Sequence, residues 1–361
     1  MRIVYGIHGY GRGHSSRALA VLPDLAARHE LLILAGGDAY QALRADYPVV
    51  AIPTFRYRLK KSGRRALFGT LVGAVPSVLD LLLRGPALEM VCELVAGFAP
   101  DAVVSDSEPW THRVARRLGI PRISFDRYAA LVHCKWPMGW CDRLTSRLES
   151  LAYHFLMAGT ADRYVIASFY EAPPRRPGVC LVGPVLRDIV RDTRPVRGDY
   201  LLAYFSNGHI HFTPRVEQVL RASRVSSVVY GTGREGVDGT LDFRPPSNTR
   251  FVEDLARCRA VFSTAGNQLI SEAIHLRKPL LLMPEDALEQ RLNAEAVERL
   301  GVGLRTSRTR VTPEAIHQFL ADEPRYAEHF PDRPADGRAR AVAAIERAAG
   351  ELAAERQGGN V

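Results

Sequence analysis

The sequence predicts an α/β protein built from two successive doubly wound domains that face a cleft. Short β-branched or apolar runs alternate with longer amphipathic stretches, the pattern of βαβ units and a parallel sheet. A Pro- and Arg-rich stretch, residues 173–197, interrupts this alternation, which then restarts. The length of 361 residues also exceeds what one hydrophobic core usually supports.

The alternation gives an order of expected elements. In the first half we expect strands at residues 2–6, 31–35, 49–52, 102–106, 122–125, 163–167 and 179–182, and helices at 15–28, 109–118 and 142–157. In the second half we expect strands at 200–205, 227–230, 249–252, 260–263 and 279–283, and helices at 214–223, 268–276 and 288–300. The predicted division is a Rossmann-like domain at 1–182, a linker at 183–199, a second Rossmann-like domain at 200–336, and a helix and tail at 337–361. This last helix could pack on the second domain or cross back to the first.

Composition narrows the class of partner. The net charge of +9 favours anionic partners, although a bias toward arginine codons would also explain it. The sequence has neither paired Cys/His fingers nor a ribonucleoprotein strand signature, so we expect no nucleic acid but phosphates on a small molecule or lipid. Five scattered cysteines without a C-x-x-C pair argue against a disulfide framework and a zinc site. With no signal peptide or membrane-spanning run in view, the expected location is cytoplasmic.

The strongest motif lies in the second half. A strand ends at Ser263, and a small-residue turn then opens a helix, whose free N–H groups and positive dipole end suit a phosphate. Six residues after Gly266, Glu272 could accept hydrogen bonds from a ribose diol. The acid and amide of Glu289 and Gln290 suit the hydroxyls of a hexose. The alternative is that Glu272 decorates a solvated helix face and Gln290 caps a helix.

The ordered set of a glycine turn, Glu272-Ala273, Pro279, Pro284, Glu289-Gln290 and Asn293-Ala294 resembles the donor-binding half of the glycosyltransferase B (GT-B) superfamily. It is most similar to the bacterial cell-wall N-acetylglucosaminyltransferase, and next to the UDP-glycosyltransferases. The resemblance implies that Glu272 holds the ribose and that Glu289 and Gln290 hold the sugar. It implies that the diphosphate binds at the turn, which comprises Thr264, Ala265, Gly266 and Asn267. It also implies that Phe251 and Val252 flank the nucleotide base.

Two further features fit a diphosphate. Ser206, Asn207 and Gly208 form a glycine-bearing turn after the first strand of the second domain, although an ordinary strand-to-helix turn would look the same. Arg187 resembles the linker arginine of the cell-wall enzymes, although the matching segment here has one inserted residue. In a chain rich in arginine, coincidence is the alternative.

The chain opens with a strand that runs into Gly9, Gly11 and Gly13, followed by His14. The G-x-G-x-G spacing departs from the dinucleotide fingerprint. It resembles the glycine-rich turn ending in histidine of the same glycosyltransferases, which implies donor contacts from Gly11 and Gly13. His14 would be the general base and Asp106, after a later strand, its partner. Imidazole suits this task because a carboxylate fixes its tautomer and raises its basicity. The alternative is a helix-capping histidine and a strand-end aspartate.

Asp106-Ser107-Glu108 lacks the second aspartate of a D-x-D metal motif, so we expect no metal and no cofactor.

A basic stretch precedes an apolar run at residues 66–83 and contains Arg56, Arg58, Lys60, Lys61, Arg64 and Arg65. It could bind an anionic membrane surface or an acceptor phosphate, or be a solvated loop.

Together these features predict an inverting, metal-independent hexosyl- or N-acetylhexosaminyltransferase that uses a nucleotide-sugar donor, with UDP favoured by the resemblance. The acceptor would be a small molecule or a lipid-linked hydroxyl. Two alternatives stay open: a nucleotide-sugar 2-epimerase of the same fold, and a non-catalytic sugar-nucleotide sensor or partner subunit.

Overall fold

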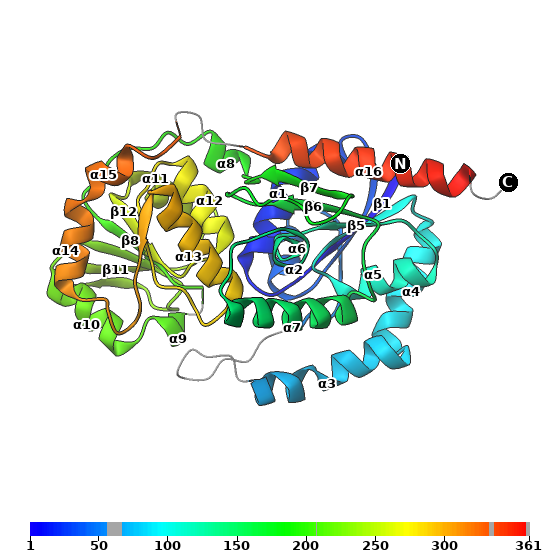
Figure 1. The fold of residues 1–361 in the computed structure, drawn as a ribbon, viewed down its shortest axis with the longest axis horizontal. Coiled ribbons are helices and arrows are strands. Elements are labelled where there is room, and N and C mark those ends of the chain that lie inside the picture. The colour runs from blue at the N-terminus through cyan, green and yellow to red at the C-terminus, as the bar shows by residue number, and fades with distance from the viewer. Residues whose placement is uncertain (56–66, 207, 332–335, 359–361) are drawn as a thin grey trace. The chain divides into compact units, whose positions relative to one another are not determined.

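The computed structural model describes residues 1–55, 67–206, 208–331 and 336–358. The basic stretch Arg56–Arg65 and Asn207 lie outside the described residues. The chain divides into two compact units, the first with residues 1–55, 67–186 and 336–358, the second with 187–206 and 208–331. Each unit contains a seven-stranded sheet, which confirms the predicted α/β class (Figure 1).

The sheet of the first unit is parallel, with the order β3-β2-β1-β4-β5-β6-β7. This order reverses direction between β1 and β4, as in doubly wound folds. The strands are β1 (Arg2–Ile7), β2 (Glu30–Ala35), β3 (Val49–Ala51), β4 (Ala102–Asp106), β5 (Arg122–Phe125), β6 (Arg163–Ala167) and β7 (Val179–Gly183). The helices are α1 (Arg12–Ala26), α2 (Gly37–Leu43), α3 (Leu67–Leu83), α4 (Pro86–Phe98), α5 (Pro109–Arg117), α6 (Ala129–His133), α7 (Trp140–Leu156) and α16 (Arg338–Gly358).

Helices cover both faces of this sheet because its strands are apolar on both faces. Alternate residues of a strand point to opposite sides. Ile3 and Tyr5 of β1 accordingly join a core with α1 and α16, whereas Val4 joins a second core with α4 and α5. A nearly continuous apolar run such as β1 is therefore what a strand buried on both faces requires.

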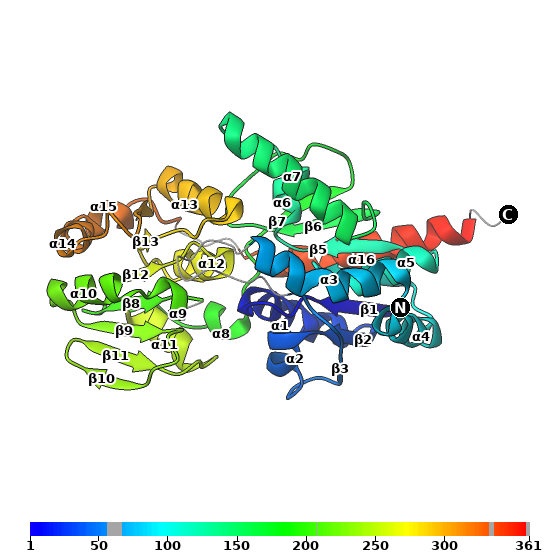
Figure 2. The same cartoon turned by 90° about the horizontal axis from the view of Figure 1, so that it is seen from below.

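The sheet of the second unit has the order β10-β11-β9-β8-β12-β13-β14, which Figure 2 shows from β13 to β10. All neighbours are parallel except β10 and β11. Its strands are β8 (Leu201–Tyr204), β9 (Ser227–Tyr230), β10 (Gly236–Asp238), β11 (Leu241–Arg244), β12 (Ala260–Ser263), β13 (Leu280–Leu282) and β14 (Gly303–Arg305). Its helices are α8 (Asp188–Arg191), α9 (Gly208–His211), α10 (Pro214–Ser223), α11 (Arg250–Arg257), α12 (Asn267–His275), α13 (Leu288–Leu300), α14 (Pro313–Ala321) and α15 (Glu323–Ala327).

One expected element is wrong in type. Residues 249–252 were predicted as a strand but belong to the start of α11. The physical reason is helical periodicity, since Val252, Leu255 and Ala256 are buried while Glu253 and Arg257 are exposed. The place beside β9 is taken instead by β11, which the sequence analysis missed together with β10 and β14.

The last helix resolves an alternative that the sequence left open. α16 packs on α1, β6 and β7 of the first unit. Ala341, Ile345 and Ala349 on one side of the helix join the core of that unit. The small side chains of Ala341 and Ala349, on either side of Ile345, let the helix approach the sheet closely.

Candidate functional site

The first candidate site lies where the strand order of the first unit reverses. β1 and β4 are neighbours, and Ile7 pairs with Asp106 at the carboxyl ends of the two strands. His14 lies in the first turn of α1, which follows β1 after a glycine-rich loop. The carboxyl edge at such a switch point is where open α/β sheets bind ligands. The fold therefore brings together two residues that are 92 positions apart in the sequence.

His14 and Asp106 are in direct contact. His14 Nδ1 lies 2.7 Å from Asp106 Oδ1, and Asp106 is fully buried whereas the His14 side chain is 23% exposed. Burial raises the pKa of Asp106, but the charges and hydrogen bonds of Arg17 and His14 outweigh it and lower the pKa overall. An ionised Asp106 accepts a hydrogen bond, so Nδ1 carries the proton and Nε2 presents a lone pair. This is the tautomer that a general base needs.

Arg17 is a third member of this site that sequence reasoning missed. Its Nε donates to Asp106 Oδ2 at 2.9 Å, and its Nη2 donates to Oδ1, which His14 also contacts. Nη2 also lies 3.2 Å from His14 Nδ1. The side chain is buried, and its position one helical turn after His14 was the available signal. Arg17 therefore shares the carboxylate with the histidine and neutralises it.

The glycine loop before α1 has one conformational requirement. Gly11 has φ +84°, a left-handed backbone that favours glycine, and its amide donates to Asp38 Oδ2 at 3.1 Å. A Cβ at Gly11 would meet nothing within 4 Å, so the space above it is open. Gly13 lies in the first turn of α1. The loop thus leaves room for a ligand beside His14.

Glu108 has a structural task of its own. It is buried and caps α5, accepting hydrogen bonds from the amides of Trp110 (2.8 Å) and Thr111 (2.7 Å). Burial raises the pKa of Glu108 to about 7, although these hydrogen bonds lower it in part. Asp106 and Glu108 thus contact different partners. Across the described ranges, no group of three or more His, Cys, Asp or Glu side chains is arranged to hold a metal ion.

The second candidate site surrounds the N-terminus of α12. The turn Thr264–Gly266 follows β12, and Gly266 caps the helix without a side-chain hydrogen bond. A Cβ at Gly266 would meet nothing within 4 Å. Asn267, half-buried, is the first residue of the helix. The positive end of the helix dipole therefore meets open space at Gly266, which is what the predicted anion site requires.

Glu272 lies on α12 and is paired. Its Oε1 accepts hydrogen bonds from Arg187 Nη2 at 3.3 Å and from Gln268 Nε2 at 3.0 Å. Glu272 and Arg187 are both buried, so Glu272 does not decorate a solvated helix face. Within the described part of the chain no hydrogen bond reaches its second oxygen, Oε2. One oxygen of Glu272 is thus held and the other is left for a ligand.

Glu289 and Gln290 differ in what remains available. Gln290 Oε1 accepts hydrogen bonds from the amides of Ala265 (3.1 Å) and Glu285 (2.9 Å), so this oxygen holds the turn. Asn293 Nδ2 donates to the carbonyl of Ala265 at 3.0 Å and completes the clamp. Glu289 is half-buried in the first turn of α13, with no hydrogen bond or ion pair among the described residues. Glu289 is therefore free to bind a ligand, whereas Gln290 retains only its amide nitrogen.

Glu285 belongs to a cluster that sequence reasoning missed. Ser206 Oγ donates to Glu285 Oε1 at 3.3 Å, and Nε2 of the buried His211 lies 3.1 Å from the same oxygen. Burial raises the pKa of Glu285, but the neighbouring side chains of His211, Gln290 and Ser206 lower the pKa overall. Ser206 therefore lies at the carboxyl ends of β8 and β13, beside the Gln290 clamp.

The other predicted residues of the second unit have structural contacts. A Cβ at Gly208 would lie 2.2 Å from the carbonyl oxygen of Gly231, which accepts a hydrogen bond from the Gly208 amide at 3.0 Å. Glycine is required there for backbone packing. Phe251 packs edge-on against Tyr204 and Tyr230, and Val252 is fully buried. The side chain of Val252 is therefore out of reach of a ligand.

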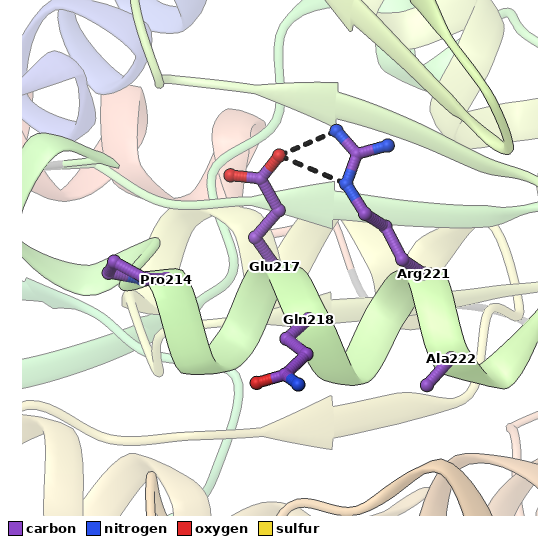
Figure 3. Close-up of a pocket in the computed structure, with 5 residues that line it drawn as sticks. All are labelled: Pro214, Glu217, Gln218, Arg221 and Ala222. Atoms are coloured by element: carbon purple, nitrogen blue, oxygen red, sulfur yellow. Dashed lines mark hydrogen bonds and ion pairs between the residues drawn. The ribbon is translucent and has the colours of Figure 1, made fainter.

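A surface pocket on α10 holds none of the predicted residues (Figure 3). It is lined by Pro214, Glu217, Gln218, Arg221 and Ala222. Its charged members pair with one another, since Arg221 Nη2 donates to Glu217 Oε1 at 2.6 Å. A mutually neutralised pair on an open surface offers little to a substrate. The two strand-edge sites remain the candidates.

Comparison with known proteins identifies the family to which the chain belongs. Residues 1–324 match the model of the family described as glycosyl transferase family 1. No curated protein matches the chain. No helix in the described part of the chain is long and apolar enough to cross a membrane.

Three solved structures illustrate the structural likeness. CalG4, the calicheamicin glycosyltransferase, is 18% identical, with a TM-score of 0.65 over 98% of this chain and 99% of that one. Arabidopsis thaliana UGT89C1, solved in complex with UDP, is 16% identical, with a TM-score of 0.63 over 98% and 99%. Acinetobacter baumannii MurG is 14% identical, with a TM-score of 0.58 over 96% and 99%. These matches confirm the predicted GT-B fold of two Rossmann-like domains.

Proposed function

The chain belongs to glycosyl transferase family 1, and from this premise we propose that it transfers a hexosyl or N-acetylhexosaminyl group from a UDP-sugar to an acceptor hydroxyl. The transfer inverts the anomeric centre and needs no metal. The observation that carries the proposal is the contact of 2.7 Å between His14 and Asp106 at the switch point of the first sheet. A sensor has no need of this oriented base, and an epimerase acting on the donor alone has no acceptor hydroxyl for it to deprotonate.

In the proposed reaction, His14 is the general base. Nε2 takes the proton of the acceptor hydroxyl while its oxygen attacks C1 of the sugar. The bond between C1 and the diphosphate oxygen breaks, and the nucleoside diphosphate leaves with that electron pair. Asp106 stabilises the imidazolium that forms, as the aspartate does in a Ser-His-Asp triad. Attack opposite the leaving group inverts C1.

The second unit provides the groups that bind the donor. The N-terminus of α12 and the guanidinium of Arg187 neutralise charge that develops on the diphosphate. Glu272 accepts hydrogen bonds from the ribose hydroxyls through Oε2, and Glu289 accepts them from the sugar. Gln290 fixes the turn through Oε1 and contributes its amide nitrogen. Because a helix terminus and an arginine meet the negative charge, a divalent ion is unnecessary.

Similar structures support a pyrimidine nucleoside diphosphate, and the family resemblance favours UDP among these. UGT89C1 was solved with UDP, and another structural match, VinC, with dTDP. A pyrimidine nucleoside diphosphate is common to both. Contacts of a base with the backbone beside Phe251 would fit this class.

The test is calorimetric titration with UDP, dTDP, GDP and ADP in buffer containing EDTA, followed by product analysis with UDP-sugars and hydroxylated acceptors. We expect UDP to bind most tightly and both binding and transfer to persist in EDTA. Tighter binding of another nucleotide would correct the donor. Loss of transfer in EDTA that magnesium or manganese restores would overturn metal independence. Isomerisation of the donor without any acceptor would replace transfer by epimerisation.

A further inference from the structure

The helix α7 of the first unit exposes a continuous apolar face. Its large exposed side chains are between 52% and 77% exposed and comprise Trp140, Leu144, Leu148, Leu151 and Phe155. Their spacings of four, four, three and four residues place all five on one side of a helix. A stripe of this kind normally faces a core. Here it faces away from the described part of its unit.

The opposite side of α7 is polar and fixes the helix to the unit. Tyr153 donates to Asp126 Oδ2 at 2.9 Å, and Ser146 donates to the carbonyl of Leu131 at 3.3 Å. Glu149 accepts a hydrogen bond from Tyr128 at 2.8 Å. The orientation is therefore specified by hydrogen bonds to α6 and to the end of β5. These hydrogen bonds on the opposite side of the helix hold the apolar face outward.

Charge on the exposed face is positive only. The remaining exposed residues of α7 are Cys141, Arg143, Arg147 and Ala152, and its two acids, Asp142 and Glu149, are only partly exposed. Arg147 borders the apolar stripe on the helix surface. Aromatic and leucine side chains beside arginine, with tryptophan at one end, are the composition of helices that lie in a lipid interface.

We propose that this α7 face docks on an anionic lipid surface, with the helix lying in the plane of the interface. Charge decides between this partner and a second copy of the chain. Two copies meeting through the same face would bring arginines together without an exposed acid to pair with them, whereas anionic headgroups complement them. Within the same unit, α3 also exposes apolar residues, Val75, Leu79, Leu82 and Leu83. Both helices lie on the lower side of the unit in Figure 1 and nearest the viewer in Figure 2.

The test is co-sedimentation of the full chain with vesicles of phosphatidylcholine alone or mixed with phosphatidylglycerol. We expect binding to the anionic vesicles, weakened about tenfold or more by the double substitution Leu148→Ser/Leu151→Ser. Arg147→Gln should weaken binding less and reduce its dependence on salt. The matched control is Val237→Ser, at an equally exposed apolar residue of the second unit, which should bind like the wild type.

Because the substituted side chains are exposed, the variants should keep the wild-type melting temperature, which is measured alongside. Wild type that stays in the supernatant with anionic vesicles overturns the proposal. Equal binding by the double variant and the wild type moves the contact to another surface. A wild-type dimer that the double variant abolishes, together with no vesicle binding, assigns the face to a second copy.

Discussion

Asp106 in the first unit and Glu272 in the second are both buried carboxylates paired with an arginine, yet they differ in their capacity to accept further hydrogen bonds. Both oxygens of Asp106 accept hydrogen bonds, from Arg17 and from His14. Glu272 receives both of its hydrogen bonds on Oε1, from Arg187 and Gln268. A saturated carboxylate can only orient its neighbours, whereas a half-saturated one can still accept from a ligand. The difference fits the two proposed roles, which are positioning of the base for Asp106 and ligand binding for Glu272.

The largest effect is expected at the residue that Asp106 orients. His14→Ala should lower turnover by about 10²–10⁴-fold, the usual worth of a positioned base. Affinity for the nucleoside diphosphate should stay unchanged, because the proposed donor-binding groups lie in the second unit. Asp106→Asn should show a milder loss, and the two losses should not add because the residues act as one unit.

The measurement is release of the nucleoside diphosphate in the presence of acceptor, across a range of pH. Wild-type turnover should depend on pH through the base, and the His14→Ala profile should lose this dependence. Near-normal turnover with an unchanged pH profile would show that another group, or the acceptor itself, acts as the base.

The two arginines should differ in their contribution to stability. Arg17→Met leaves Asp106 buried with His14 alone, and breaking such a buried pair costs about 3–5 kcal/mol. Arg187→Met also breaks a buried pair, but Arg187 contacts Glu272 through one hydrogen bond of 3.3 Å whereas Arg17 makes two to Asp106, so a smaller loss is expected.

Urea unfolding can be followed by two signals, of which one reports on the first unit alone. All three tryptophans, Trp110, Trp136 and Trp140, lie in the first unit, so their fluorescence follows Arg17→Met. Circular dichroism follows both units and serves for Arg187→Met. Similar shifts of the two transitions would remove the distinction between a saturated and a half-saturated carboxylate.

Binding should depend on Glu272 directly. Glu272→Ala should weaken UDP binding by about 1–3 kcal/mol, because the ribose hydroxyls lose a charged acceptor. Titration calorimetry measures this change, with Glu253→Ala as a matched control at an exposed glutamate of the same unit. If the two variants bind UDP equally well, Glu272 does not contact the ribose.

Glu108 sharpens the comparison because it is a buried carboxylate with no arginine partner among its described contacts. Burial raises its pKa to about 7. A carboxyl with a raised pKa in the folded state contributes stability that is full below the unfolded pKa and is lost as pH rises toward 7. From pH 5 to pH 8 this loss is on the order of 2 kcal/mol.

Glu108→Gln, which cannot ionise, should remove this part of the pH dependence, whatever constant offset the lost acceptor adds. The measurement is the urea midpoint by tryptophan fluorescence at pH 5 and pH 8, in wild type and variant. Parallel pH dependence in the two proteins would show that Glu108 is not the titrating group.

Most strands of the two sheets, and the strand ends that carry the candidate sites, could be located from the sequence, whereas β10, β11 and β14 could not. Apolar runs identified β1, β4 and β12, and the carboxyl ends of parallel strands share one edge of a sheet. The pairing of His14 with Asp106 was implied by the family resemblance, and the structure shows that the two residues follow neighbouring strands. The glycine turn before α12 could be located because it directly follows the apolar run of β12. Local periodicity and strand ends depend on residues that are close together in the chain, so a sequence pattern can predict them.

Tertiary structure decided what each side chain does at those edges. Arg17 donates to the second oxygen of Asp106, a residue 89 positions away in the chain. Gln290 accepts a hydrogen bond from the amide of Ala265, 25 positions away. The helical start of α11 and the return of α16 to the first unit were likewise settled by which face found a core. An apolar stripe such as that of α7 looks the same in sequence whether it is covered or exposed. Only packing distinguishes the two, because burial is a property of the neighbours and not of the residue itself.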